Sequence, residues 1–385
     1  MVLGWRDKAV PGWAQGLTAA EFLARAPGLA ELGTPLLTID RPALRHNIAA
    51  MAAWCSASGL AHAPHGKTTM APSIWRAQIE AGAQAITLAT AAQLRVARAS
   101  GFDQLVLANA LLDPVALRWL RAELDEHPRF EFVSFVDSER AVRLMTEALD
   151  GVSRPVGVCV ELGAPGGRAG CRDDDEAVAV AEAIRKSPVL RFAGVAGYEG
   201  ILAHDVLPES RAVVAAFLER MARMAATLEA ELVTAGGSTY FDLVGEILGP
   251  LVAQGTTVQL RAGCYVTHDD GFYARTSPLA GELRSAIHGW ARVLSRPEPG
   301  LALLDGGKRD FPYDDGLPVP LDVPGGEVFA VNDQHAYLRL APGSSVEVGD
   351  VVRLGLSHPC TAFDKWGLIP VAEDGVVVDL IRTYF

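Results

Sequence analysis

The stretch AITLATAAQLRVARASGFDQLVLAN (85–109) contains two short apolar runs, AITLAT and QLVLAN, on either side of a segment with helical spacing. A strand, a helix and a second strand in this order are typical of a βα unit, in which the two strands run parallel. The same alternation continues on both sides of this stretch, from about residue 34 to residue 266. We therefore expect a parallel sheet with intervening helices over this part of the chain.

The number of apolar runs decides which parallel-sheet architecture is expected. Eight runs follow an opening strand, TPLLTID (34–40), and a helix that starts near Ala43. Eight parallel strands with intervening helices indicate a (β/α)8 TIM-type barrel, whose active site lies at the carboxyl ends of the strands. The eight runs are LAHAPHGK (60–67), AITLAT (85–90), QLVLAN (104–109), FEFVSFV (130–136), VGVCVEL (156–162), FAGVAGYE (192–199), ELVTAGG (231–237) and TVQLRAG (257–263).

Beyond about residue 275 the pattern changes to short strands separated by Gly, Pro and Asp turns, without helical spacing. A barrel takes about 250 residues, so a chain of 385 residues has room for a second, all-β domain. We expect the barrel over 30–272 and the β domain over 1–29 and 273–385. The expected β-domain strands are GWARVLS (289–295), LALLDGG (301–307), EVFAVND (327–333), HAYLRLA (335–341), DVVRLGLSH (350–358) and VVVDLIRTY (376–384).

The composition excludes several classes of protein. Half of the residues are hydrophobic and 21% are charged, as in a globular protein with a large core. The net charge of −12 and the lack of a Lys/Arg cluster disfavour nucleic acid as a partner. No stretch approaches the roughly 18 apolar residues of a membrane span, no signal peptide is recognised, and the five cysteines are an odd, scattered set. We therefore expect a cytoplasmic protein with neither a membrane nor a nucleic-acid partner.

Lys67 lies in the segment APHGKTTMAP (63–72), at the end of the first barrel strand and just before a helix. A lysine there would place its amine in the barrel mouth, where apolar walls favour the uncharged form that attacks an aldehyde. Position alone is also consistent with an exposed lysine that has no catalytic role. Whether Lys67 is a catalytic lysine therefore depends on the motifs around it.

That context is an ordered set of motifs. PHGKT (64–68) follows the opening TPLLTIDRPALRHNI (34–48). Together with the later motifs, it resembles D-serine dehydratases and D-threonine aldolases, which are pyridoxal-phosphate (PLP) enzymes with an alanine-racemase-like barrel (fold type III) and a following β domain. The resemblance covers nearly the whole chain and implies that Lys67 is the Schiff-base lysine, which exchanges protons at the substrate Cα. The later motifs are ITLAT (86–90), GYEG (197–200), TAGGST (234–239), RAGCYV (261–266) and SHPC (357–360).

Two small-residue loops are expected to bind the cofactor phosphate. They follow the seventh and eighth strands, where barrels commonly bind phosphate because small residues let backbone N–H groups approach it. An ordinary Gly-rich turn is the alternative for each. The matching residues are Gly236, Gly237, Ser238 and Thr239 in the first loop and Gly263, Cys264 and Tyr265 in the second.

Two further residues match cofactor contacts of the family. Arg168, in ELGAPGGRAGCRD (161–173), corresponds to an arginine that faces the phenolic oxygen of PLP. An arginine there would keep that oxygen anionic. Tyr198 ends the sixth strand and corresponds to a tyrosine of the cofactor pocket. A surface arginine and a buried aromatic residue are the alternatives.

His358 and Cys360 in GLSHPCTAFDKW (355–366) form a candidate metal site. Residues i and i+2 of an extended chain point to the same face, and sulfur with imidazole suits Zn²⁺. In the resembling enzymes this position holds a metal next to the PLP ring, with His-x-Cys in the zinc-dependent dehydratases and His-x-Asp in the aldolases. The cysteine favours zinc, with Mn²⁺ or another divalent cation as the alternative metal. A packed strand that binds no metal is the other possible interpretation of this segment. His335 and Asp305 are polar β-domain positions for which a structural hydrogen bond is expected.

The resemblance implies a PLP- and zinc-dependent dehydratase that converts a D-3-hydroxy amino acid such as D-serine into a 2-oxo acid and ammonia. It also implies a homodimer. A metal-dependent aldolase of the D-threonine aldolase type is the nearest alternative. An amino acid racemase, a PLP-binding protein without turnover and a barrel enzyme without PLP are further alternatives.

Three features depart from the aldolase pattern. D-threonine aldolases usually carry Arg where this chain has Ala63 and His where it has Thr69. The phosphate segment reads GGSTYF (236–241) instead of the commoner Gly-Ser/Thr-Pro-Thr type. These differences place the chain in a divergent branch, so the resemblance does not determine the substrate.

Overall fold

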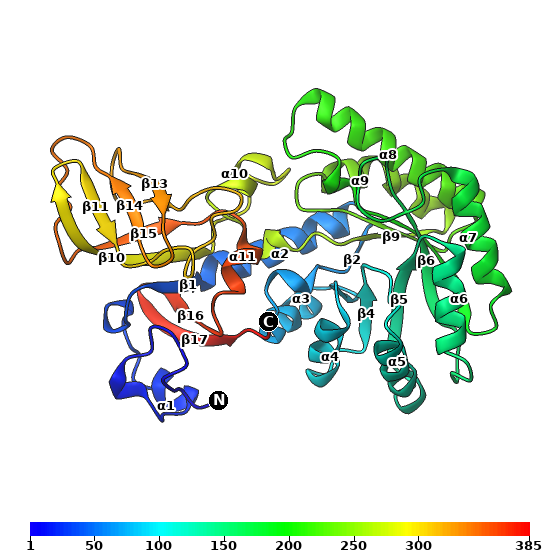
Figure 1. The fold of residues 1–385 in the computed structure, drawn as a ribbon, viewed down its shortest axis with the longest axis horizontal. Coiled ribbons are helices and arrows are strands. Elements are labelled where there is room, and N and C mark those ends of the chain that lie inside the picture. The colour runs from blue at the N-terminus through cyan, green and yellow to red at the C-terminus, as the bar shows by residue number, and fades with distance from the viewer. The chain divides into compact units, whose positions relative to one another are not determined.

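The computed structural model describes residues 1–385, which form two compact units. The barrel unit consists of residues 51–67 and 75–263, and the β unit consists of residues 1–50, 68–74 and 264–385. Figure 1 labels the helices and strands of both units. The two units interleave along the chain. Our proposal for the two domains remains a barrel over 30–272 and a β domain over 1–29 and 273–385.

The barrel unit contains eight parallel strands, and each overlaps one of the eight expected runs. The strands follow the order β2-β9-β8-β7-β6-β5-β4-β3. The expected barrel of eight parallel strands is therefore confirmed. The strands are β2 (Ala61–His62), β3 (Ile86–Leu88), β4 (Gln104–Leu107), β5 (Glu131–Val136), β6 (Val156–Leu162), β7 (Leu190–Gly197), β8 (Leu232–Ala235) and β9 (Thr257–Leu260).

The two ends of this strand order meet just beyond β2. His65 forms a parallel bridge with Thr87 of β3. The Thr87 N–H donates to the carbonyl of Pro64 at 3.0 Å, and the Thr87 hydroxyl donates to the carbonyl of Ala63 at 2.6 Å. These bonds close the barrel at the segment that carries Lys67.

Helices follow the strands, and α6 and α7 flank them on the outside (Figure 1). The Ser138 hydroxyl caps α6 and accepts the backbone N–H of Ala141 at 3.3 Å. Apolar faces of the helices cover the strands, and mainly small side chains such as Ala63 and Ala193 fill part of the interior. The helices are α2 (Arg41–Ala57), α3 (Pro72–Glu80), α4 (Ala91–Ala99), α5 (Pro114–Glu126), α6 (Glu139–Ala148), α7 (Asp174–Lys186), α8 (Pro208–Thr227) and α9 (Phe241–Leu248).

The β unit is built on a nine-stranded sheet in which β15 pairs with both β10 and β12. The remaining strands follow the order β13-β14-β11-β10-β1-β16-β17. N-terminal residues, including Leu3 and Phe22, pack with Leu368 and Val377 of this unit. The strands are β1 (Leu36–Asp40), β10 (Ile287–Glu298), β11 (Leu301–Leu304), β12 (Val319–Pro320), β13 (Glu327–Val331), β14 (Ala336–Arg339), β15 (Val351–Gly355), β16 (Leu368–Glu373) and β17 (Val376–Arg382).

The β unit differs from the sequence-based expectation in three respects. The strand β1 lies within 30–272 but pairs antiparallel with β10 and parallel with β16. The strand β16 was not expected, because its residues are nearly all buried and show no alternation of polar and apolar side chains. Short helices also occur where only strands and turns were expected: α10 (Phe272–Thr276) and α11 (Pro359–Phe363), besides the N-terminal α1 (Ala19–Leu23).

None of the helices combines the length and the apolar character that crossing a membrane requires.

Candidate cofactor and metal site

Lys67 lies in the 3-10 turn Gly66–Thr68, directly after the segment that closes the barrel. Close packing shapes this turn. A Cβ on Gly66 would lie 2.7 Å from Ile86 and 2.9 Å from Trp75, so a larger residue does not fit. The Trp75 indole also donates to the Gly66 carbonyl at 3.1 Å. The barrel wall therefore fixes the backbone that presents Lys67.

His65 lies near several positively charged residues of the barrel unit. The residue is half-buried, and its Nδ1 atom is buried without a hydrogen-bond partner. Burial lowers the pKa of His65 well below its usual value, and the charges of Lys67, Arg261 and Arg168 lower it further. His65 is therefore a neutral imidazole with an unused polar atom, two residues from Lys67. A bound ligand or ion is one explanation for a buried polar atom without a partner.

Arg168 and Tyr198, both predicted to contact the cofactor, lie together. The guanidinium carbon of Arg168 is 5.0 Å from the centroid of the Tyr198 ring, a cation–π distance. Arg168 follows β6, and Tyr198 directly follows β7. Both residues therefore come from the carboxyl ends of neighbouring strands.

Backbone N–H groups of the loop after β8 donate to a side chain, which the sequence did not predict. The buried carboxylate of Glu199 accepts the N–H of Gly236 at 3.0 Å and also accepts the N–H of Gly237. Ser238 and Thr239 follow and are buried. The two glycine amides expected for phosphate are thus already bonded to a side chain. Glu199 belongs to the GYEG motif, which was the only signal for it.

Arg261 is a second residue that sequence reasoning missed. It begins the RAGCYV motif and is buried in the barrel unit, where it donates to the Thr234 hydroxyl at 2.7 Å and to the Gly197 carbonyl at 2.6 Å. Burial lowers the pKa of Arg261, while the carboxylates of Glu199 and Glu161 oppose that shift. Arg261 therefore offsets the negative charge near the predicted phosphate loop.

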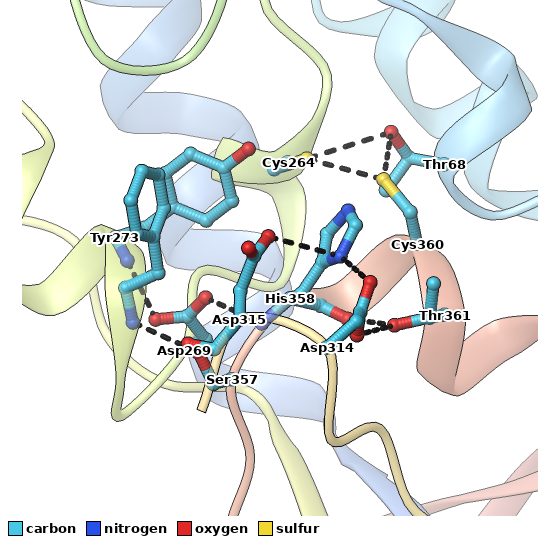
Figure 2. Close-up of polar contacts among 11 residues, drawn as sticks. Thr68, Cys264, Asp269, Tyr273, Asp314, Asp315, Ser357, His358, Cys360 and Thr361 are labelled. Atoms are coloured by element: carbon cyan, nitrogen blue, oxygen red, sulfur yellow. Dashed lines mark hydrogen bonds and ion pairs between the residues drawn. The ribbon is translucent and has the colours of Figure 1, made fainter. Parts of the chain in front are cut away.

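The second predicted phosphate loop continues from Gly263 into the β unit. Cys264 and Tyr265 form the buried turn Cys264–Val266 there. The thiol of Cys264 lies 3.4 Å from the Cys360 sulfur, and the Thr68 hydroxyl lies 3.7 Å and 3.5 Å from the two sulfurs (Figure 2). The hydrogen bond with Cys360 lowers the pKa of Cys264 to about 6. The Cys264 side chain therefore faces the predicted metal residues.

The backbone at His358 corrects our reasoning about the metal residues. We expected an extended chain, but His358 adopts φ 63° and ψ 82° and precedes α11, whose first turn contains Cys360. Pro359 occupies the first helical position, which suits its fixed φ and starts the helix. The two side chains therefore do not share one face of a strand, and the helical turn determines their directions.

Two aspartates hold the His358 ring. Its Nδ1 atom lies 2.6 Å from an Asp314 carboxylate oxygen and 3.1 Å from an Asp315 oxygen (Figure 2). Burial raises the pKa of Asp314, but hydrogen bonds from Thr361 and His358 and the charge of His358 outweigh burial, so the pKa of Asp314 is lowered. The acidic oxygens and the imidazole lie within 4.8 Å of one another, as in a cation site. Neither aspartate was singled out from the sequence.

Asp269 connects the loop of His358 to α10. One of its buried carboxylate oxygens accepts the His358 N–H at 3.0 Å, and the other accepts three backbone N–H groups at the start of α10, including that of Tyr273 at 2.8 Å. Burial raises the pKa of Asp269, and these bonds oppose the shift. The bonds therefore fix the backbone around His358.

Asp305 and His335 do not join this group. Asp305 accepts the Thr34 hydroxyl at 2.6 Å and the Arg292 N–H at 2.8 Å, which is the structural role expected for it. The His335 side chain is exposed in the turn between β13 and β14.

Comparisons with known proteins agree with this architecture. Residues 39–245 match the family "Alanine racemase, N-terminal domain", and residues 286–372 match the "Putative serine dehydratase domain". D-threonine aldolase of an Arthrobacter species is 30% identical over 364 residues, which cover 91% of this chain and 92% of the aldolase.

Solved structures give the same result for the fold. The D-threonine aldolase of Filomicrobium marinum superposes with a TM-score of 0.82 at 26% identity, over 92% of this chain and 96% of that one. D-threo-3-hydroxyaspartate dehydratase of a Delftia species superposes with a TM-score of 0.76 at 23% identity, over 93% and 99%, a similarity that concerns the fold. This chain therefore belongs to the family of PLP-dependent lyases with an alanine-racemase-like barrel that includes D-threonine aldolase.

Proposed function

We propose that this protein is a PLP- and zinc-dependent dehydratase that converts a D-3-hydroxy amino acid such as D-serine into a 2-oxo acid and ammonia. The observation that carries the proposal is the set of sulfur and imidazole donors at His358 and Cys360. Such donors suit zinc, and zinc is a Lewis acid that helps a hydroxyl group to leave. We also propose a homodimer in the cytoplasm.

The residues of the barrel unit fit PLP. When bound, PLP supplies an electron sink for the pair released at the substrate Cα. We assign its covalent attachment to Lys67, and the unpartnered Nδ1 atom of neighbouring His65 supports a ligand there. Arg168 would hold the phenolic oxygen anionic. Tyr198, under the Arg168 guanidinium, would hold that side chain in place.

We assign the phosphate to the two loops predicted from the sequence, with one change. Glu199 already accepts the amides of Gly236 and Gly237, so these glycines would shape the loop. Ser238 and Thr239 would supply the donors of the first loop. In the second loop, we propose that the phosphate is bound by backbone groups of Gly263, Cys264 and Tyr265.

The β unit fits the metal. His358 would bind through Nε2, because Asp314 holds Nδ1 as a donor. The Cys360 thiolate would be the second ligand. In the reaction, the amine of Lys67 would take the proton from the substrate Cα and the hydroxyl would leave from Cβ. The Cα proton and the hydroxyl together make one molecule of water. Hydrolysis of the unsaturated amine product consumes one molecule of water and releases ammonia, so the overall conversion is from D-serine to a 2-oxo acid and ammonia.

Retro-aldol cleavage is the second candidate, favoured by the identity to D-threonine aldolase. In that reaction the bond between Cα and Cβ breaks and the hydroxyl proton is removed. The products are glycine and an aldehyde. Cys360, where the resembling aldolases carry Asp, is the feature that favours the dehydratase.

The products of D-serine and D-threonine decide between the two reactions. The purified holoenzyme is incubated with each D- and L-enantiomer, and ammonia, 2-oxo acid, glycine and aldehyde are measured. We expect ammonia and 2-oxo acid from the D-enantiomers alone. Glycine and acetaldehyde from D-threonine without ammonia would assign the protein to the aldolases. Lys67→Ala should show neither reaction.

A further inference from the structure

Two cysteine thiols from distant parts of the chain meet in the β unit. The sulfurs of Cys264 and Cys360 lie 3.4 Å apart although 96 residues separate them along the chain. A disulfide would need a distance of about 2.0 Å between the sulfurs, so the two cysteines do not form a disulfide. Two sulfurs that each lie about 2.3 Å from a tetrahedral zinc ion are roughly 3.8 Å apart. A shift of a few tenths of an ångström would therefore let both sulfurs bind one ion.

The imidazole of His358 provides a third donor of the right kind. Its Nδ1 atom is held by Asp314 and Asp315, and Figure 2 shows its other ring nitrogen pointing to the side on which the two sulfurs lie. Metal-bound histidines almost always donate their second nitrogen to a carboxylate or carbonyl in this way. The ring orientation is therefore that of a ligand, but the donor atoms within 4.8 Å of one another are those of Asp314, Asp315 and His358, so the ring must also move toward the sulfurs when an ion binds.

We infer that Cys264 is the third protein ligand of the metal, together with Cys360 and His358. This inference rests on the proposed zinc site and completes it. Two cysteines and one histidine leave one of four positions open, which is the arrangement of catalytic zinc. Two thiolates and a neutral imidazole also balance the charge of the ion. Soft sulfur donors select zinc over Mn²⁺, so Cys264 makes the site more selective than His358 and Cys360 alone would.

Zinc-edge X-ray absorption of the reduced holoenzyme counts the sulfur ligands directly. We expect two sulfurs and one imidazole in the wild type, and one sulfur in Cys264→Ser. The wild-type spectrum needs no substitution, so it tests the inference even if the variant misfolds. One sulfur in the wild type, or two in Cys264→Ser, would overturn the inference.

Zinc affinity gives a second readout that does not depend on turnover. Loss of an outer-shell partner alone costs about 10- to 100-fold in metal affinity, so Cys264→Ser should weaken zinc binding at least tenfold in a competition assay with a chromophoric chelator. Cys55→Ala is the matched control, because Cys55 is also a buried free cysteine but lies in the barrel unit. Equal affinity in Cys264→Ser and the wild type would overturn the inference.

The outcomes also separate this inference from the proposed function. Two sulfurs on zinc without ammonia release from any D-3-hydroxy amino acid would leave the metal site standing and reject the dehydratase. Ammonia release by an enzyme with one sulfur on zinc would reject the role of Cys264 and keep the dehydratase.

Discussion

Nδ1 of His358 lies 2.6 Å from a carboxylate oxygen of Asp314, and the Thr361 hydroxyl donates to the other Asp314 oxygen at 2.7 Å. The carboxylate therefore orients the imidazole while its own position is fixed by the first turn of α11. We expect Asp314→Asn to weaken zinc binding by about 10- to 100-fold without loss of the fold. Asp333→Asn is the control, because Asp333 is an exposed carboxylate that pairs with Arg309. Titration with a competing chelator measures both, and equal affinities would reject the role of Asp314.

Removal of the metal should affect turnover and spare the PLP content. We assign PLP to Lys67 and to backbone and hydroxyl groups of the two phosphate loops, whereas the proposed metal ligands are side chains of the β unit. A chelator should therefore abolish ammonia release while the visible absorption of lysine-bound PLP persists. Added Zn²⁺ should restore the wild type but not Cys360→Ala. Unchanged ammonia release after complete metal removal would rule out the zinc mechanism.

Lys67 should carry the cofactor. Borohydride reduces the bond between PLP and its lysine to a stable amine, so peptide mapping should find the label on Lys67. Lys67→Ala should lose this label and turnover, because the same amine is expected to move the Cα proton. Lys308→Ala, a substitution in the β unit, is the control. A label on any lysine other than Lys67 would contradict the assignment.

Gly66→Ala should destabilise the barrel. Its Cβ would lie 2.7 Å from Ile86 and 2.9 Å from Trp75, and overpacking of this kind typically costs about 1–3 kcal/mol. Gly249→Ala is the matched control, since a Cβ on Gly249 would meet no atom within 4 Å and φ is −48°. Urea unfolding followed by circular dichroism should give a lower midpoint for Gly66→Ala alone. Equal midpoints would show that the Lys67 turn tolerates a side chain.

Buried histidines should make the protein acid-sensitive. Burial lowers the pKa of His62 from 6.5 to about 4. Between these values the unfolded chain binds a proton that the folded chain does not, so stability falls as the pH decreases through this window. Each such histidine contributes at most about 1.4 kcal/mol per pH unit.

The test compares urea unfolding at several pH values within that window. His62→Gln removes the titrating group and keeps a donor for the Ala262 carbonyl, which His62 contacts at 3.3 Å. Its stability should therefore depend less steeply on pH than that of the wild type. His127→Gln, a substitution of an exposed histidine, is the control. An unchanged slope in His62→Gln would contradict the role of burial.

The barrel could be predicted from the sequence because its strands are buried on both faces. A strand such as β6 then appears as a continuous apolar run, and its partners follow in chain order. The same reasoning failed for β16, whose run LIPVAE contains a proline and shows no alternation. It also failed at His358, where a positive φ and Pro359 turn an expected strand into a helix start.

The sequence by itself identified the order of the motifs and therefore Lys67, Arg168, Tyr198, His358 and Cys360 as candidates. Only the tertiary structure decided which atoms meet. Glu199 bonds the amide of Gly237 across 38 residues, Asp314 holds His358 across 44, and Cys264 faces Cys360 across 96. Contacts over such separations depend on how strands and loops pack, and local propensity carries no information about them. The physical reason is that chain order specifies neighbours within an element, whereas burial and hydrogen bonding between elements specify the site.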